Sequence, residues 1–207
     1  MYKRQVPENN ALVKSEFRNG IVIPRSDIAP YIEEDDCVLL GPGMTRDRDT
    51  ETLTNTLLKT HPHKQWVLDA GALQMMDVSL IPKHAILTPH HGEFVHAFGS
   101  EEAAVVAKKY HCIVLLKGEK DIACNADGEC WVIKGGNPGM TKGGTGDVLA
   151  GLIAALACKN DPFLATIAGS FINKKAGDAL YKKVGPYFNA TDLANQIPLT
   201  MKDLLIG

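Results

Sequence analysis

The stretch GGNPGMTKGGTGDVLAGLIAAL, residues 135–156, joins a loop pattern to a helix pattern. Its first half holds mostly glycine, proline and small polar residues, which favour a loop. Glycines at a helix entry let backbone N–H groups converge, and the helix dipole adds partial positive charge there. The stretch therefore predicts an anion site around Gly144, Thr145 and Gly146, suited to phosphate or to a transferring phosphoryl group. The second half predicts a helix over about 146–158, with apolar residues at helical spacing: Val148, Leu149, Leu152, Ile153 and Leu156.

Upstream of this stretch, short apolar runs alternate with helix-length segments. Continuous apolarity is typical of strands covered on both faces, as in parallel sheets. This order predicts a mostly parallel sheet between two layers of helices. The predicted strands lie at 20–24, 37–41, 66–70, 85–89 and 112–118, and the predicted helices near 26–33, 47–60, 71–77, 92–98 and 100–110.

The rest of the chain adds a hairpin and two more helices. Residues 121–133 predict a hairpin that turns at 126–128. Asp161 and Pro162 favour the start of a long helix over about 161–184, and residues 189–198 predict a short last helix. The chain of 207 residues is long enough for one domain with a sizeable core. We therefore expect a single three-layer α/β/α domain over residues 1–207, with an antiparallel hairpin late in its sheet.

Composition narrows the class of function. Hydrophobic residues make up 45% of the chain, which indicates a globular protein. The formal net charge of −2 gives no electrostatic basis for binding nucleic acid. No apolar run reaches membrane-spanning length, and the first ten residues lack the apolar core of a signal peptide. We expect a cytoplasmic protein that contacts neither nucleic acid nor membrane.

The cysteines predict reduced thiols. Their number is odd, and no two of them form a CxxC pair. Buried, reduced thiols in a cytosolic protein are the natural interpretation, so neither a disulfide framework nor a zinc site is expected. The two histidines His61 and His63 supply too few ligands for a metal. The five cysteines are Cys37, Cys112, Cys124, Cys130 and Cys158.

Asp147 is the only carboxylate in the glycine-rich stretch. One interpretation is helix capping, a common role for Asp at a helix start. The other is catalysis, because an acid beside bound phosphates is electrostatically adverse unless it has a task there. Accepting a proton from a hydroxyl that attacks phosphorus is such a task, while the N–H groups stabilise the transferring group. We predict that Asp147 is a cap and a general base together.

Polar and glycine residues also follow the predicted strands. In open α/β sheets, ligands bind beyond the carboxyl ends of the strands. His90 is either a satisfied structural residue or a ligand contact, and Lys117 either a surface lysine with a buried stem or a ligand contact. The place of His90 beyond a strand end favours ligand contact, whereas both interpretations of Lys117 stay open. Lys142, inside the glycine loop, is either a phosphate partner or a flexible surface lysine. The strand ends are Gly41–Gly43, Asp69–Gly71, Thr88–Glu93 and Lys117–Gly118.

The segment GNPGMTKGGTGDVLAG resembles the signature of the ADP-dependent NAD(P)H-hydrate dehydratases, which belong to the ribokinase-like superfamily. The segments LLGPGM, VLDAGAL, LTPHHGEF and LLKGEKDI resemble further motifs of that family, and all five lie in family order within residues 37–178. Two positions depart from the family, because His91 replaces the usual proline and Gly71 replaces an Asp. Asp121 stands where many bacterial members have Thr, which suggests the archaeal or eukaryotic branch.

The resemblance implies repair of NADHX and NADPHX, which are damaged, hydrated forms of the reduced nicotinamide cofactors. The ring hydroxyl would be phosphorylated by ADP or ATP with Mg²⁺, and phosphate loss would restore NADH or NADPH. Gly43, His90 and Asp147 would bind the hydrate, with Asp147 as the base. Asn137 and Glu93 are candidate neighbours of phosphate or magnesium. The residues implied for the nucleotide are Lys117, Gly118, Glu119, Lys120, Asp121 and Gly146.

The resemblance also implies partners. Family members begin with a further strand–helix portion that nothing here matches, so we expect a ribokinase-like domain without it. We also expect the chain to lack the epimerase domain that is often fused ahead of this one in relatives, and NAD(P)HX epimerase is the expected functional partner. Relatives commonly assemble into tetramers or larger rings, which implies a homo-oligomer, expected as a tetramer.

Two other functions stay open. A hydroxyethylthiazole or pyridoxal-type kinase of the same superfamily shares the Gly-Thr-Gly loop, although thiazole kinases typically carry Cys where Asp147 stands. A non-catalytic nucleotide-binding subunit is the other alternative. The Asn-Pro-Gly-Met approach and the Thr-Pro-His-x-Gly-Glu stretch favour the dehydratase.

Overall fold

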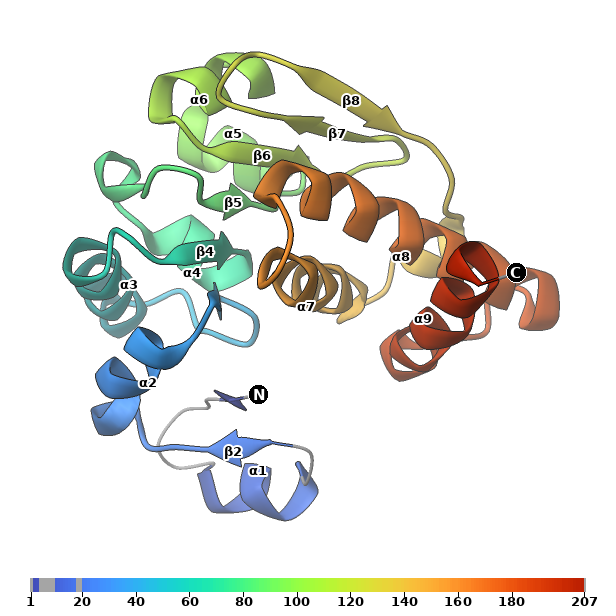
Figure 1. Cartoon of the computed structure of the whole chain (residues 1–207), viewed down its shortest axis with the longest axis horizontal. Helices are drawn as coiled ribbons and strands as arrows, with labels where there is room; N and C mark the ends of the chain where they lie inside the picture. Colours follow the sequence, from blue (N-terminus) through green and yellow to red (C-terminus); the bar gives the residue numbers. More distant parts are fainter. Residues whose placement is uncertain (1, 4–9, 18–19, 207) are drawn as a thin grey trace.

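A computed structural model describes residues 2–3, 10–17 and 20–206. These residues surround a six-stranded sheet in the order β3-β4-β5-β6-β7-β8 (Figure 1). The first four strands are parallel, and the last two pairings are antiparallel. The predicted sheet and its late hairpin are therefore confirmed. The strands are β3 (Cys37–Leu40), β4 (Gln65–Leu68), β5 (Ile86–Leu87), β6 (Ile113–Leu116), β7 (Asp121–Cys124) and β8 (Cys130–Ile133).

Helices cover both faces of this sheet, as Figure 1 shows. Successive strand residues point to opposite faces, so Leu68 packs into one core cluster and its neighbour Val67 into the other. This arrangement confirms the three-layer α/β/α prediction. One face carries α3 (Arg48–Thr60), α4 (Ala70–Met75), α5 (His91–Phe98) and α6 (Ala103–Tyr110), and the other carries α7 (Thr145–Ala157) and α8 (Pro162–Val184).

The segment before β3 departs from the prediction. Its elements are β1 (Tyr2–Lys3), α1 (Asn10–Glu16), β2 (Ile21–Val22) and α2 (Ile28–Glu34). The strand expected at 20–24 is wrong as a member of the main sheet, because β2 pairs with β1 in a separate two-stranded sheet. The physical reason is its one-sided burial: Val22 is buried while Ile21 is 51% exposed. A strand inside a parallel sheet would be covered on both faces.

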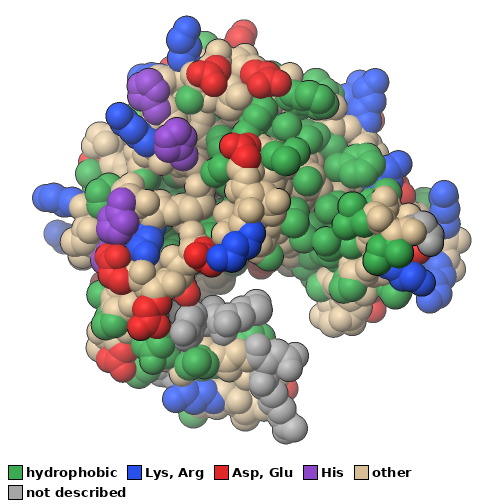
Figure 2. Space-filling view, in the orientation of Figure 1, with side chains coloured by type: hydrophobic (Ala, Val, Ile, Leu, Met, Phe, Trp, Pro, Cys, Tyr) green, Lys and Arg blue, Asp and Glu red, His purple; other side chains and the backbone are tan. Residues whose placement is uncertain are grey.

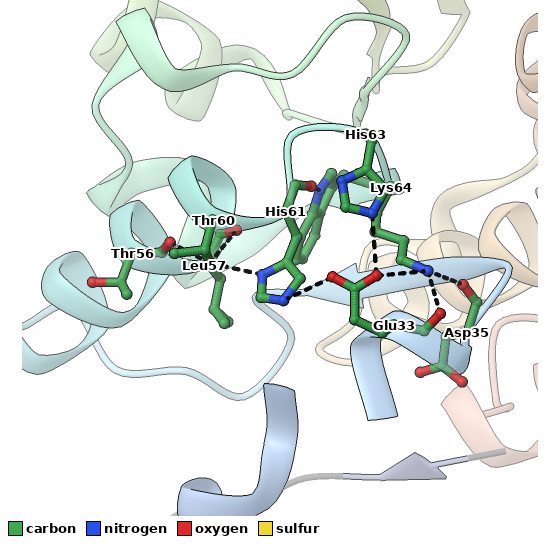
Figure 3. A network of polar contacts seen from close by, with 9 residues as sticks. Glu33, Asp35, Thr56, Leu57, Thr60, His61, His63 and Lys64 are labelled. Carbon is green, nitrogen blue, oxygen red and sulfur yellow. Dashed lines mark hydrogen bonds and ion pairs between the residues drawn. The ribbon is translucent and has the colours of Figure 1, made fainter. Parts of the chain in front are cut away.

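A polar cluster fixes α2 against the amino end of β4 (Figure 3). The Glu33 carboxylate lies 3.3 Å from His61 Nε2, 3.2 Å from His63 Nε2 and 3.6 Å from Lys64 Nζ. The Lys64 ammonium also donates to the Glu33 carbonyl at 2.6 Å. The hydrogen bond with His63 lowers the pKa of the Glu33 carboxyl, and the charges of His63, Lys64 and His61 lower it further. These contacts join α2 to the loop between α3 and β4, at the end of the sheet opposite the glycine loop.

The cysteine prediction is wrong for one pair. Cys124 and Cys130 form a disulfide across the β7–β8 hairpin, with a Cα–Cα distance of 4.2 Å. The hairpin register sets these two residues directly opposite each other. Register depends on the turn and on packing, neither of which cysteine spacing reveals. Cys37, Cys112 and Cys158 are free thiols, and burial raises the pKa of the Cys37 and Cys112 thiols to about 12.

We expect reduction of the Cys124–Cys130 disulfide to lower the free energy of unfolding by about 2 kcal/mol. The estimate is the loop-closure entropy for a short closed loop, since the two residues are separated by 6 positions. Urea unfolding of Cys130→Ser, and of the wild type with and without reductant, measures it. The matched control is Cys158→Ser, which should keep its sensitivity to reductant. A wild type whose stability ignores reductant would contradict the disulfide.

The last helix is longer than the sequence predicts. Helix α9 (Ala190–Leu205) continues through Pro198, whereas the prediction ended it there. Leu193, Ile197 and Thr200 are buried on the face that packs against α8. Pro198 removes one backbone hydrogen bond, and the packing of this face maintains the helix on both sides of it. Within the described part of the chain, no helix is both long and apolar enough to cross a membrane.

Candidate active site

The carboxyl ends of the parallel strands meet the amino end of α7. Asp69 follows β4, His90 follows β5 and Lys117 follows β6. His90 and Lys117 form a parallel bridge, and the Lys117 N–H donates to the Pro89 carbonyl at 2.8 Å. The sequence predicts that these residues lie together, because each of them follows a strand of the sheet.

Lys117 forms a salt bridge inside this site. Its ammonium lies 2.8 Å from Asp69 Oδ1, an oxygen that also accepts a hydrogen bond from Thr88 Oγ1 at 2.8 Å. The Asp69 side chain is only 2% exposed and that of Lys117 is 18% exposed. The interpretation of Lys117 as a surface lysine is therefore wrong. A Cβ atom at Gly146 would lie 3.5 Å from Lys117 Nζ, so the ammonium reaches the glycine loop.

The glycine loop enters α7 with free N–H groups. Gly144 is the N-cap, with φ of 89°, a left-handed conformation that a side chain would strain. The Thr145 hydroxyl donates within the loop to the carbonyls of Met140 and Lys142, at 2.6 and 2.8 Å. Among the described residues, no acceptor pairs with the N–H groups of Gly146 and Asp147. These donors at a helix start form the predicted anion site.

Lys142 stabilises the glycine loop through contacts with residues that follow α8. Its ammonium donates to the Phe188 carbonyl at 2.7 Å and to the Pro186 carbonyl, and lies 5.2 Å from the centre of the Phe188 ring. Neither interpretation made from the sequence describes this residue. Lys142 holds the loop to the connection between α8 and α9.

Asp147 occupies the third position of α7 and is exposed. Its carboxylate accepts no hydrogen bond from the described residues, and Gly144 takes the N-cap position. The capping interpretation is therefore wrong. Loss of hydration in this recess raises the pKa of the Asp147 carboxyl, and the negative charges of Asp69 and Glu93 raise it further, while the Lys117 charge lowers it. An unpaired carboxyl with a raised pKa beside an anion site is suited to accept a proton.

His90 combines a structural contact with an exposed ring. It is the N-cap of α5, where its Nδ1 accepts the Glu93 N–H at 3.2 Å and Glu93 Oε2 accepts the His90 N–H at 2.9 Å. The other Glu93 oxygen accepts from Gln74 Nε2 at 2.9 Å and lies 3.6 Å from His90 Nε2. The His90 side chain is 57% exposed, so it remains open to a ligand.

The loop after β3 passes over α4. Gly43 lies in its turn, with open space where a side chain would project. Gly71, which replaces an Asp of the family motif, is buried. A Cβ atom there would come within 2.3 Å of the Met44 carbonyl oxygen. The departure therefore has a physical reason, since only glycine allows this close backbone contact.

A cavity of about 500 Å³ opens beside the anion site. It is bounded by the turn after β6, the loop that leads to α7, the start of α7 and the middle of α8. Among the residues proposed for nucleotide, Lys120 is exposed and lies outside it. Its lining includes Lys117, Gly118, Glu119, Asp121, Asn137, Thr145, Gly146, Leu149, Asn173 and Lys174.

A polar stripe on α8 supports both cavity loops. Ser170, Lys174 and Asp178 are four residues apart, which places them on one helix face. Ser170 Oγ donates to Asp121 Oδ2 at 2.7 Å. The Lys174 ammonium lies 3.2 Å from Asp121 Oδ1 and donates to the carbonyls of Gly118 and Glu119, each at 3.2 Å.

Asp178 completes this stripe at the second loop. Its carboxylate accepts from the Gly136 N–H and from Asn137 Nδ2, both at 3.2 Å. Asn137 Oδ1 in turn accepts the Gly139 N–H at 3.0 Å. None of the three stripe residues was predicted from the sequence. Their four-residue spacing along the predicted helix was the available signal.

A family model described as NAD(P)H-hydrate dehydratase matches residues 4–199 of the chain. The chain belongs to the NAD(P)H-hydrate dehydratase family. Over 174 residues it is 38% identical to a bifunctional NAD(P)H-hydrate repair enzyme of Archaeoglobus fulgidus, covering 83% of this chain and 36% of that protein. Over 147 residues it is 40% identical to an ADP-dependent (S)-NAD(P)H-hydrate dehydratase of Nitrosopumilus maritimus, covering 65% of this chain and 51% of that protein.

A solved structure shares the fold of this dehydratase-family chain. The ADP/ATP-dependent NAD(P)H-hydrate dehydratase of Bacillus subtilis, co-crystallized with ATP and Mg²⁺, gives a TM-score of 0.71 at 28% identity, covering 81% of this chain and 64% of that one. The ribokinase-like fold class predicted from the motifs is confirmed. The chain spans 36% and 51% of the length of the two curated relatives.

Proposed function

We propose that this chain converts NADHX and NADPHX back to NADH and NADPH, with ADP as the phosphoryl donor. The observation that carries the proposal is the unpaired Asp147 carboxylate at the free N–H groups of α7, in a chain of the dehydratase family. The names of the relatives, one of them an ADP-dependent dehydratase, support the same reaction.

The site chemistry follows from this geometry. The hydroxyl oxygen of the hydrate attacks the β-phosphorus of ADP, the bond between that phosphorus and AMP breaks, and Asp147 takes the hydroxyl proton. The N–H groups of Gly146 and Asp147 stabilise charge on the transferring phosphoryl group. Breakage of the carbon–oxygen bond then releases phosphate, and loss of a proton from the adjacent ring carbon restores the dihydronicotinamide. His90, which follows β5, and Gly43, which follows β3, would bind the hydrate.

Magnesium is part of the proposal, as in the Bacillus crystals with ATP and Mg²⁺. Within the described ranges, no cluster of three or more His, Cys, Asp or Glu side chains is arranged to hold a metal. This fits Mg²⁺, which in nucleotide sites is bound mainly by phosphates and water. When bound, it neutralises phosphate charge. Glu93 and Asn137 remain candidate neighbours, although their hydrogen bonds inside the protein already use most of their polar atoms.

A small-molecule kinase is the alternative, because the same base and anion site would phosphorylate any bound hydroxyl. A substrate panel separates the two: NADHX, hydroxyethylthiazole and pyridoxal, each with ADP or ATP and Mg²⁺. If the proposed function is right, AMP is released from ADP only in the reaction that contains NADHX. Phosphorylation of a vitamin alcohol without any turnover of NADHX would move the function to the kinase.

We expect Lys117→Ala to weaken nucleotide binding more than it slows the reaction at saturating nucleotide. The ammonium lies between Asp69 and the glycine loop, where it neutralises negative charge. Its loss should raise the KM for ADP about tenfold or more, the range for removing a charged hydrogen bond of about 1.5–3 kcal/mol. Initial rates over a range of ADP concentrations measure it, with exposed Lys202→Ala as the control. An unchanged KM for ADP would contradict this role.

The proposal extends to partners. The bifunctional relative is consistent with an epimerase as the functional partner, acting on the other stereoisomer of the hydrate. A homo-oligomer is supported by exposed apolar side chains over edge strand β8 and α8, the region where Figure 2 shows hydrophobic atoms together. The residues are Trp131, Val132, Leu164 and Phe171. Light scattering of the purified protein tests the tetramer.

A further inference from the structure

Asn173 has a polar side chain without a partner in the wall of the cavity. It lies on α8, is 4% exposed, and its Oδ1 atom is fully buried. No described residue donates a hydrogen bond to that oxygen. Buried polar groups are paired as a rule, so an unpaired amide needs an explanation. Because Asn173 lines the cavity, the occupant of the cavity is the natural source of the missing donor.

The donors around Asn173 are already used. The Lys174 ammonium donates to two carbonyls and contacts Asp121. The Ser170 hydroxyl donates to Asp121 as well. These contacts hold the cavity loops in place and leave Asn173 Oδ1 without a hydrogen-bond donor. On this one helix, Ser170 and Lys174 support the loops, whereas Asn173 lines the cavity and supports neither loop.

The position of Asn173 in the cavity indicates which part of a nucleotide it meets. The phosphates belong at the start of α7, where Thr145 and Gly146 line the cavity. The nucleoside then fills the remainder, against Leu149 and the middle of α8. An amide side chain is a good match for adenine, because its oxygen accepts from the exocyclic amine while its NH₂ group donates to a ring nitrogen.

We propose that Asn173 recognises the adenine base and sets the preference for adenine over hypoxanthine nucleotides. On the edge of the base that carries N7, hypoxanthine has an oxygen acceptor in place of the exocyclic amine and no N–H donor, so it would leave Oδ1 without a donor. The proposal rests on the proposed function, since it takes the cavity as the nucleotide site. It adds a specificity residue that the sequence analysis did not include.

Calorimetric binding of ADP, IDP and 2′-deoxy-ADP to the wild type and Asn173→Leu tests the proposal. The wild type should bind ADP tighter than IDP by roughly tenfold to a hundredfold, the range for a paired amide–adenine contact. Asn173→Leu should lose most of this preference by binding ADP more weakly. The exposed amide of Asn195 supplies the control, and Asn195→Leu should behave as the wild type.

Thermal unfolding without nucleotide separates recognition from support of the fold. Leucine has nearly the shape of asparagine and leaves no unpaired polar atom, so Asn173→Leu should melt at or above the wild-type temperature. A lower melting temperature with unchanged base preference would overturn the inference. So would an effect on 2′-deoxy-ADP instead of IDP, which would place Asn173 at the ribose. Failure of the wild type to bind any adenine nucleotide would overturn the proposed function itself.

Discussion

Asp147→Asn should lower kcat by about 10²–10⁴-fold, the usual contribution of a positioned general base. Asn keeps the size and hydrogen-bonding shape of Asp but does not accept the hydroxyl proton. Affinity for ADP should stay within a few-fold of the wild type, because the N–H groups of the glycine loop are unchanged. Recovery of NADH from NADHX measures the rate, and calorimetry measures ADP binding.

The control for this substitution is Asp203→Asn, an exposed carboxylate on α9. It should leave both kcat and ADP affinity unchanged. If Asp147→Asn turns over at the wild-type rate, the base assignment is wrong. Loss of ADP binding together with turnover would instead indicate a binding role for Asp147.

The raised pKa of Asp147 has two further consequences. The base must be deprotonated, so kcat should fall with decreasing pH at a pKa above the ordinary aspartate value of 3.8. The folded state also binds this proton more tightly than the unfolded state, so Asp147 favours folding at low pH and loses that contribution as pH rises through the folded pKa. At neutral pH the charged carboxylate is a net cost, and Asp147→Asn should raise the melting temperature while it removes activity.

Asp121→Ala should have the largest effect on stability, with a loss of about 3–5 kcal/mol in the free energy of unfolding. Removing one partner of a buried ion pair leaves the other charge buried and unpaired. The Lys174 and Asp121 side chains are 8% and 5% exposed, and Asp121 also accepts from the Gly118 N–H at 2.9 Å and from Ser170. Urea unfolding measures the loss.

A double substitution separates this ion pair from nucleotide contact. Asp121→Leu with Lys174→Met removes both charges, and such replacements are often neutral. The double variant should therefore recover much of the stability that Asp121→Ala loses. Asp36→Ala, which breaks an exposed ion pair with Lys159, should change stability far less. A stable Asp121→Ala protein that only binds ADP more weakly would instead support the sequence-based assignment of Asp121 as a direct nucleotide contact.

The sequence predicted the layers and the loop because their signals are local. Continuous apolar runs indicate buried parallel strands, and glycines before an apolar helix indicate the anion site at 144–146. Gly144 shows this agreement, since its conformation requires glycine. The place of Asp147 could also be predicted, but its lack of a capping contact required the helix start to be seen at Gly144.

The contacts that the sequence did not predict join distant segments. Lys117 pairs with Asp69, 48 residues away, and Lys174 supports Gly118 from 56 residues away. The sequence around each of these lysines gives no indication of its distant partner. The Cys124–Cys130 disulfide was missed because hairpin register, not spacing, brings the two sulfur atoms together.

The most direct test of the central claim is the recovery of NADH absorbance from NADHX in three reactions. The first contains ADP and Mg²⁺, the second contains Mg²⁺ alone, and the third contains ADP and the Asp147→Asn protein. We expect fast recovery in the first reaction, with one AMP and one phosphate released for each NADH formed, no recovery with Mg²⁺ alone, and a rate about 10²–10⁴-fold lower with the Asp147→Asn protein. That stoichiometry would place the phosphoryl transfer at this site. Equal recovery without nucleotide, or ADP binding without any recovery by the wild type, would contradict the proposed reaction.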